Sequence, residues 1–201
     1  MKYYTNIFIF IGYFCLSLIS LLNVYKFLKK GLYIQMSSYI SLCIGTLLLG
    51  VSYGKQLLID LDDTMNTLTN NLKMYGHLLY SLYIIILLVS YLLFKKLKIK
   101  FNPLDYIGLI AHMLFFFIVY YHLNHTMHIY ATLLLVSYYL LSDYYYYEYT
   151  NNTFKIITYL LISIGFIFYL YIDNKVYDKV YNMLKTSETT NYITSEHTKQ
   201  A

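Results

Sequence analysis

Three histidines lie close together in a short segment that connects two apolar stretches. They are His122, His125 and His128, at positions i, i+3 and i+6, and the connection carries no formal charge. Imidazoles grouped in this way could bind a metal ion or carry protons. No carboxylate or thiolate lies near them in the sequence to complete a metal site, and the segment falls where helices enter the membrane interface. We therefore expect interfacial polar residues here, with no bound metal.

Two further histidines, His77 and His112, lie within apolar stretches. A histidine inside a membrane span needs a partner in the bundle, so each is a candidate functional residue. Two histidines on neighbouring helices could also ligate a haem. Antiparallel packing, however, predicts that His77 and His112 lie at opposite or unequal depths, and no spacing motif links them. The sequence therefore predicts no cofactor, with a haem-binding membrane anchor kept as the third-ranked alternative.

Tyrosines are concentrated around the fourth and fifth apolar stretches. Tyrosine prefers the membrane interface, so this pattern indicates an aromatic anchor rather than a redox or quinone site. The residues concerned are Tyr120, Tyr121, Tyr138, Tyr139, Tyr144, Tyr145, Tyr146, Tyr147 and Tyr149.

The centres of the apolar stretches contain no Lys, Asp or Glu. This argues against a pump, antiporter or ion channel that relies on buried charges. It also removes the usual pairing of a nucleophile with a base. No phosphate-binding glycine loop, HExxH motif or extended basic patch is present, so nucleic-acid binding has no support. The sequence predicts at most a structural subunit, with no catalytic residues of its own and no soluble small-molecule substrate.

The elements that must position these residues are long apolar helices. The chain has 201 residues, of which 59% are apolar and 12% charged, about half the charge of a soluble domain. Six stretches reach or approach the roughly 20 residues that span a bilayer, and they are apolar on all sides. We therefore predict an all-α polytopic transmembrane bundle. The six predicted spans are Tyr4 to Leu28, Leu32 to Ile59, Met74 to Phe94, Leu104 to Leu123, Met127 to Tyr147 and Phe154 to Ile172.

The chain divides into a bundle over residues 1–172 and an extramembrane segment over residues 173–201. In the latter, Val176, Tyr177, Val180, Tyr181 and Leu184 recur on one helical face, which predicts a short amphipathic helix that lies in the interface or docks on a partner. The remaining tail is too polar to fold alone.

Small residues recur every fourth position in the second predicted span. Ser37, Ser41 and Gly45 form one series, and Thr46, Gly50 and Gly54 form another. Small side chains at this spacing allow two helix backbones to approach closely inside lipid. The second span is therefore predicted to be the central packing helix, with ordinary intramolecular packing favoured over dimerisation.

Composition and charge indicate an origin and an orientation. The chain has no Arg or Trp and only three Ala, but 28 Tyr, which is the bias of an extremely AT-rich genome. An organelle genome fits so hydrophobic a protein, and a small parasite or symbiont genome is the rival source. Lysines outnumber acidic residues on the loops after the first, third and fifth spans. The positive-inside rule places these Lys-rich loops in the matrix or cytoplasm.

The fourth predicted span resembles one helix of a known family. The run Tyr106-Ile-Gly-Leu-Ile-Ala111, followed by Met113, Leu114, Phe115 and Phe116, is similar to the third helix of subunit 6 of mitochondrial NADH:ubiquinone oxidoreductase. The resemblance implies a helix near the junction of the quinone chamber and the proton-pumping arm, with Gly108 permitting a local π-type distortion. Tyr106 and Gly108 are the positions it carries over. The resemblance covers about a tenth of the chain, and His112 departs from the family pattern.

Together these features favour a non-catalytic membrane subunit of a mitochondrial respiratory-chain or ATP-synthase assembly, most plausibly the membrane arm of the NADH dehydrogenase. Its expected location is the mitochondrial inner membrane, and its expected partners are other membrane subunits and lipid. The first alternative is a small stand-alone transporter, which the missing internal repeat disfavours.

Overall fold

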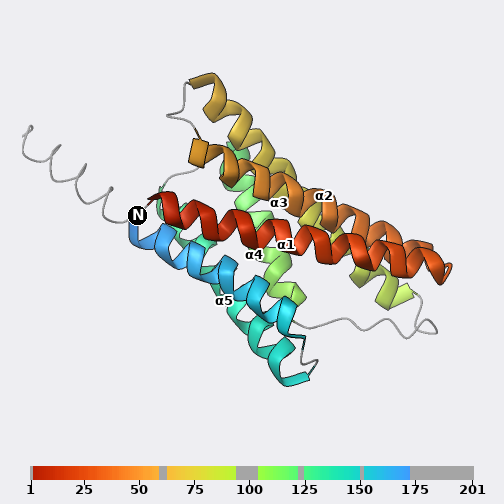
Figure 1. Ribbon diagram of the computed structural model, residues 1–201. Coiled ribbons are helices and arrows are strands. Elements are labelled where there is room, and N and C mark those ends of the chain that lie inside the picture. Colours follow the sequence, from red (N-terminus) through yellow and green to blue (C-terminus); the bar gives the residue numbers. More distant parts are fainter. Residues whose placement is uncertain (1, 59–62, 94–103, 122–124, 150–151, 173–201) are drawn as a thin grey trace, which may run out of the picture.

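The fold is an all-helical bundle in the computed structural model, which describes residues 2–58, 63–93, 104–121, 125–149 and 152–172. These ranges contain six helices and no strand, so the predicted fold class is confirmed at this level. Figure 1 shows α1, α2 and α3 packed in sequence, with α4 crossing behind α1 and the last helix beside the N-terminal part of α1. The helices are α1 (Lys2–Lys29), α2 (Tyr33–Leu58), α3 (Asp63–Leu93), α4 (Asp105–Tyr121), α5 (His125–Tyr149) and the last helix, Thr153–Ile172.

Four of the six helices are long and apolar enough to cross a membrane, which identifies a membrane protein. They contribute the segments Thr5–Lys29, Tyr33–Gln56, Thr67–Leu93 and Thr153–Ile172. α4 is apolar but has only 17 residues, or about 25 Å of helix against a hydrocarbon core of about 30 Å. The predicted amphipathic helix and tail over residues 173–201 lie outside the described residues.

The third helix begins much earlier than predicted. Its expected start was Met74, but α3 begins at Asp63 and has 31 residues, a length of about 46 Å. The difference arises because the segment from Asp63 to Lys73 is polar, a composition that predicts a loop. Polar side chains are compatible with a helix where it projects beyond the hydrocarbon. The extension moves His77 from the expected end of the helix to near its middle.

The turn between α1 and α2 is closed by a glycine. Gly31 has φ of +66°, the left-handed conformation that a side chain disfavours. Its amide donates to the carbonyl of Leu28 at 3.1 Å, and the next amide, of Leu32, donates to that of Phe27 at 3.0 Å. These two hydrogen bonds form a Schellman motif, which satisfies carbonyls at the end of α1. The motif turns the chain back on itself, so α2 lies beside α1.

α2 packs closely against α3 through small residues. A Cβ on Gly45 would lie 3.0 Å from the carbonyl oxygen of Gly76 and 3.0 Å from the amide nitrogen of Tyr80. One turn earlier, the hydroxyl of Ser41 donates to the carbonyl of Leu79 at 2.8 Å. The other small-residue series faces α1, where a Cβ on Gly54 would lie 3.0 Å from the Phe10 ring. α2 thus lies between α1 and α3.

The last helix returns along α1. Gly12 packs against Ile162, and Gly165 packs against Ile9, so residue numbers rise on one helix as they fall on the other and the two are antiparallel. Figure 1 shows the N-terminus of α1 beside the end of the last helix. The start of the first helix and the end of the last therefore lie at one end of the bundle. The opposite end holds the end of α1 and the start of the last helix.

We expect Gly45→Ala to destabilise the bundle, because the added methyl group meets backbone atoms that cannot move independently. The cost should be about 1–3 kcal/mol, which lowers the unfolding midpoint by roughly 3–10 °C for a chain of this size. The matched control is Gly50→Ala. A Cβ there would meet α1 atoms at 3.6 Å or more, so this variant should unfold at or above the wild-type temperature. Thermal unfolding in mild detergent measures both, and equal midpoints for the two variants would contradict the close approach of α2 and α3.

Candidate functional site

The candidate site is a pair of buried histidines that face each other between α3 and α4. The Nδ1 atoms of His77 and His112 lie 2.9 Å apart, and both side chains are 0% exposed. The prediction that they lie at unequal depths is therefore wrong. It failed because α3 starts at Asp63, which brings His77 to the level of His112 at the middle of α4.

Aromatic rings hold the two imidazoles in place. Phe115 stacks on His77 with ring centroids 4.7 Å apart, and Tyr80 stacks on His112 at 3.7 Å. The rings of Tyr138 and Tyr139 meet the edge of His112, each with centroids 6.2 Å apart. The rings are enclosed by α3, α4 and α5, so at rest the histidine pair is held in one orientation.

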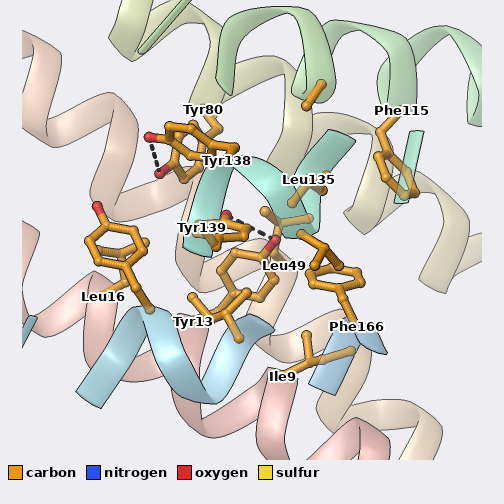
Figure 2. Packing of buried hydrophobic residues seen from close by; sticks show 14 of the residues in the cluster. Ile9, Tyr13, Leu16, Leu49, Tyr80, Phe115, Leu135, Tyr138, Tyr139 and Phe166 are labelled. Atoms are coloured by element: carbon orange, nitrogen blue, oxygen red, sulfur yellow. Dashed lines mark hydrogen bonds between the residues drawn. The ribbon is translucent and has the colours of Figure 1, made fainter. Parts of the chain in front are cut away.

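A first series of hydrogen bonds continues from the histidine pair to α1. The Nε2 atom of His112 lies 3.4 Å from the hydroxyl of Tyr139, and this hydroxyl donates to that of Tyr13 at 3.2 Å. Figure 2 shows the Tyr139 and Tyr13 hydroxyls meeting in the centre of the core. The series links α3, α4, α5 and α1, so one buried polar cluster connects four helices.

The direction of the bond from Tyr139 to Tyr13 assigns one set of proton positions to the histidine pair. Because the single hydroxyl proton of Tyr139 goes to Tyr13, the Tyr139 oxygen can only accept from His112, which must then carry its proton on Nε2. The Nδ1 atom of His112 is consequently an acceptor, and His77 donates to it from its own Nδ1. This leaves Nε2 of His77 as a bare lone pair. That atom is buried and has no hydrogen-bond partner among the described residues.

A second series of hydrogen bonds runs beside the first. The hydroxyls of Tyr80 and Tyr138 lie 3.3 Å apart, and Figure 2 marks this hydrogen bond with a dashed line. Tyr138 donates to Oδ1 of Asp105 at 3.5 Å. Since the Tyr138 proton is committed to the carboxylate, its oxygen accepts from Tyr80. All donors in this series therefore point toward Asp105, at the start of α4.

Gly108 provides the space for Tyr138. A Cβ on Gly108 would lie 2.7 Å from two carbons of the Tyr138 ring, so any side chain would displace this ring. The π-type distortion implied for Gly108 is not observed, because α4 is a regular α-helix from Asp105 to Tyr121. The missing Cβ serves packing between helices instead of a change in helix geometry. Tyr106 is 47% exposed and faces away from the cluster.

The other predicted histidine group is only partly described. His122 and the side chain of His125 lie outside the described residues. His128 is half-buried, and its ring meets the edge of Phe115 with centroids 6.3 Å apart. Within the described ranges, no three or more His, Cys, Asp or Glu side chains lie close enough together to hold a metal ion.

A haem does not fit between His77 and His112 in this geometry. Two histidines that ligate one haem face its iron from opposite sides of the porphyrin plane. Here the two imidazoles form a direct hydrogen bond, and Tyr80 and Phe115 cover their faces. The space that a porphyrin would need is filled by aromatic rings from α3 and α4.

The tyrosines do not all behave as interfacial anchors. Tyr120, Tyr121 and Tyr144 are more than half exposed, as an aromatic belt requires. Tyr138 and Tyr139 are 2% and 0% exposed, so the anchor interpretation is wrong for them. The side chains of Tyr146, Tyr147 and Tyr149 lie outside the described residues.

Three members of the cluster are not among the site residues predicted from the sequence. Tyr80 follows His77 by three residues and so shares its helix face, a signal that could have been used. Asp105 lies at the start of an apolar stretch, where an acidic residue reads as an ordinary loop charge. Tyr13 belongs to an ordinary apolar stretch, and its distance in sequence from Tyr139 leaves no local signal.

Comparison of the chain with protein-family models, with curated proteins and with solved structures finds no match. The site is therefore interpreted from its own geometry.

We expect the two histidines to be energetically coupled. Either His77→Phe or His112→Phe keeps an aromatic ring in the core but leaves Nδ1 of the remaining imidazole without its partner, at a cost of about 1–3 kcal/mol. The double variant removes both partners, so it should be less destabilised than the sum of the single variants by about 0.5–3 kcal/mol. Unfolding of the four proteins in mixed micelles measures this coupling. As a control, Tyr25→Phe, at an exposed position of α1, should be additive with His77→Phe. Additivity of the two histidine variants would contradict the observed hydrogen bond.

Proposed function

We propose that the chain is a non-catalytic integral membrane subunit of a mitochondrial respiratory-chain or ATP-synthase assembly, most plausibly of the membrane arm of NADH:ubiquinone oxidoreductase. The observation that carries the proposal is the buried histidine and tyrosine cluster, an uncharged hydrogen-bonded group at the centre of an apolar bundle. In a membrane protein, polar residues at this depth mark proton or substrate paths. A subunit of a proton-translocating assembly would use such a group to complete a path shared with its neighbours.

The buried hydroxyl groups support a role without covalent chemistry. Those of Ser20, Ser81 and Ser163 each donate to the carbonyl four residues earlier in their own helix. A serine nucleophile instead needs its hydroxyl bonded to a base. The two histidines of the cluster bond to each other and to Tyr139, so in this arrangement neither activates a serine. The bundle is thus suited to packing and proton handling.

The outer surface of α4 suits contact with other membrane subunits. Tyr106, Ile110, Phe117 and Tyr121 fall on one face of the helix, and all are at least 41% exposed. The 17 residues of α4 span less than the hydrocarbon core, and lipid cannot form hydrogen bonds with the unpaired backbone groups at its ends. A neighbouring subunit on this face would cover these groups. This is the helix that resembles the oxidoreductase subunit, and Tyr106 lies on its outward face.

The finer topology belongs to the same proposal. We infer six spans, with the Lys-rich loops in the matrix and both termini on the other face. The antiparallel contact of α1 with the last helix agrees with an even number of spans. The skew of composition toward residues with AT-rich codons supports the organelle origin.

The proposal predicts that the chain purifies as part of a large assembly. A tagged copy, extracted in mild detergent and separated by native electrophoresis, should migrate with respiratory-chain or ATP-synthase subunits identified by mass spectrometry. Recovery with NADH dehydrogenase subunits would support the specific assignment, and recovery with ATP-synthase subunits would leave only the broader one. Migration as a monodisperse particle of 24.0 kDa plus detergent, with none of these partners, would refute the subunit role and favour a stand-alone transporter.

A further inference from the structure

We propose that this chain itself contains a proton path across the bundle, from a polar recess beside α3 to Asp105 at the opposite, Lys-rich end. The path uses His77, His112, Tyr80 and Tyr138 as carriers. It concerns only the residues of this chain, so it does not depend on the assembly to which the chain belongs.

The Lys-rich end of the path is Asp105. This residue is the first of α4 and lies within electrostatic range of Lys155, which is also near Lys26. These lysines stand at the start of the last helix and the end of α1, so the three charges share one end of the bundle. A carboxylate at this position can accept a proton from Tyr138 and release it toward the loop side.

The recess lies at the other end. It has a volume of about 300 Å³ and is lined by Thr67, Asn70, Asn71, Met74, Val119 and Tyr120. Thr67, Asn70 and Asn71 belong to the polar extension of α3, Met74 follows it directly, and the residues of α4 belong to its last turn. Amide and hydroxyl groups in such a recess can hold water, which a proton path requires at its entrance.

His77 is placed one turn inside the recess. It follows the lining residue Met74 by three positions on α3, and its stacking partner Phe115 precedes the lining residue Val119 by four positions on α4. The unpartnered Nε2 atom of His77 is buried at this point. A lone pair without a donor is the group that a proton from the recess would reach first.

Hydrogen bonds join each pair of neighbouring carriers except His112 and Tyr80, and the transfer as a whole is balanced. A proton binds Nε2 of His77, and the Nδ1 proton of His77 passes to Nδ1 of His112 across 2.9 Å. His112 then releases its Nε2 proton to the oxygen of Tyr80. The Tyr80 hydroxyl proton moves to Tyr138, and that of Tyr138 moves to Asp105. Each carrier accepts one proton and gives up one, so no oxidant or reductant is needed.

The step between His112 and Tyr80 controls the path. Their rings are stacked, with centroids 3.7 Å apart and planes 10° apart, and stacked rings present their faces rather than their polar edges to each other. The Nε2 atom of His112 meanwhile points to Tyr139. One ring must therefore turn before the proton can pass, which keeps the path closed at rest.

The test is proton uptake by liposomes that contain the full chain, alone or within its purified assembly. A potassium diffusion potential drives the flux, and a trapped pH-sensitive dye reports it. Tyr138→Phe removes one hydroxyl and keeps the ring, and Asp105→Asn removes the acceptor at similar size. Each should lower the rate by about tenfold or more, since a proton-transfer group is lost. The matched control Tyr53→Phe alters another buried tyrosine, 2% exposed, and should conduct as the wild type does.

Circular dichroism and the unfolding midpoint establish that each variant is folded. Wild-type flux equal to that of protein-free liposomes, or Tyr138→Phe conducting as well as Tyr53→Phe, would overturn the proposed path. Either result would leave the subunit proposal intact if the chain still purifies with a respiratory or ATP-synthase assembly. Conversely, flux that depends on Tyr138 in a chain that purifies alone would support the path and refute the subunit role.

Discussion

The hydrogen bond between His77 and His112 is the interaction on which the rest of the core depends. In the middle of a bilayer no water is present to pair with an imidazole, so each ring must find its partner on another helix. Their 2.9 Å contact fixes the depth of α3 relative to α4. Once this depth is set, Tyr80 lies over His112 and Phe115 lies over His77. The polar pair therefore determines how the surrounding aromatic rings pack.

Glycines allow this polar core to form. Gly45 and Gly76 bring α2 and α3 together, and Gly108 gives the Tyr138 ring its place against α4. Inside lipid, helices associate through close packing rather than through the hydrophobic effect. The same contacts bring phenol and imidazole groups within hydrogen-bonding distance while no charge is buried at the centre. The described core is therefore polar without a permanent internal ion.

The helices could be predicted from the sequence, but the arrangement of the histidine and tyrosine cluster could not. Block hydropathy predicts all six helices, because long apolar segments have few alternatives in a bilayer. It fails at the start of α3, where the polar segment from Asp63 to Lys73 is helical. With the third helix expected to begin at Met74, His77 is predicted near the end of that helix and at a different depth from His112. The place of Tyr139 beside Tyr13 depends on contacts 126 residues apart, which no local pattern reveals. The preference of tyrosine for the membrane interface wrongly predicts that Tyr138 and Tyr139 are exposed anchors. A buried tyrosine whose hydroxyl has a hydrogen-bond partner is equally stable.

Nitrogen NMR of the histidine side chains in lipid bilayers tests the central claim most directly. In uniformly labelled protein, His77 and His112 should both be neutral, with the proton on Nδ1 in His77 and on Nε2 in His112. A scalar coupling should connect their Nδ1 atoms across the hydrogen bond, and it should disappear in His112→Phe while the signals of the other histidines persist. Two Nε2-protonated imidazoles without this coupling would show that the rings do not meet, and would contradict the arrangement of α3 and α4 from which the site is built.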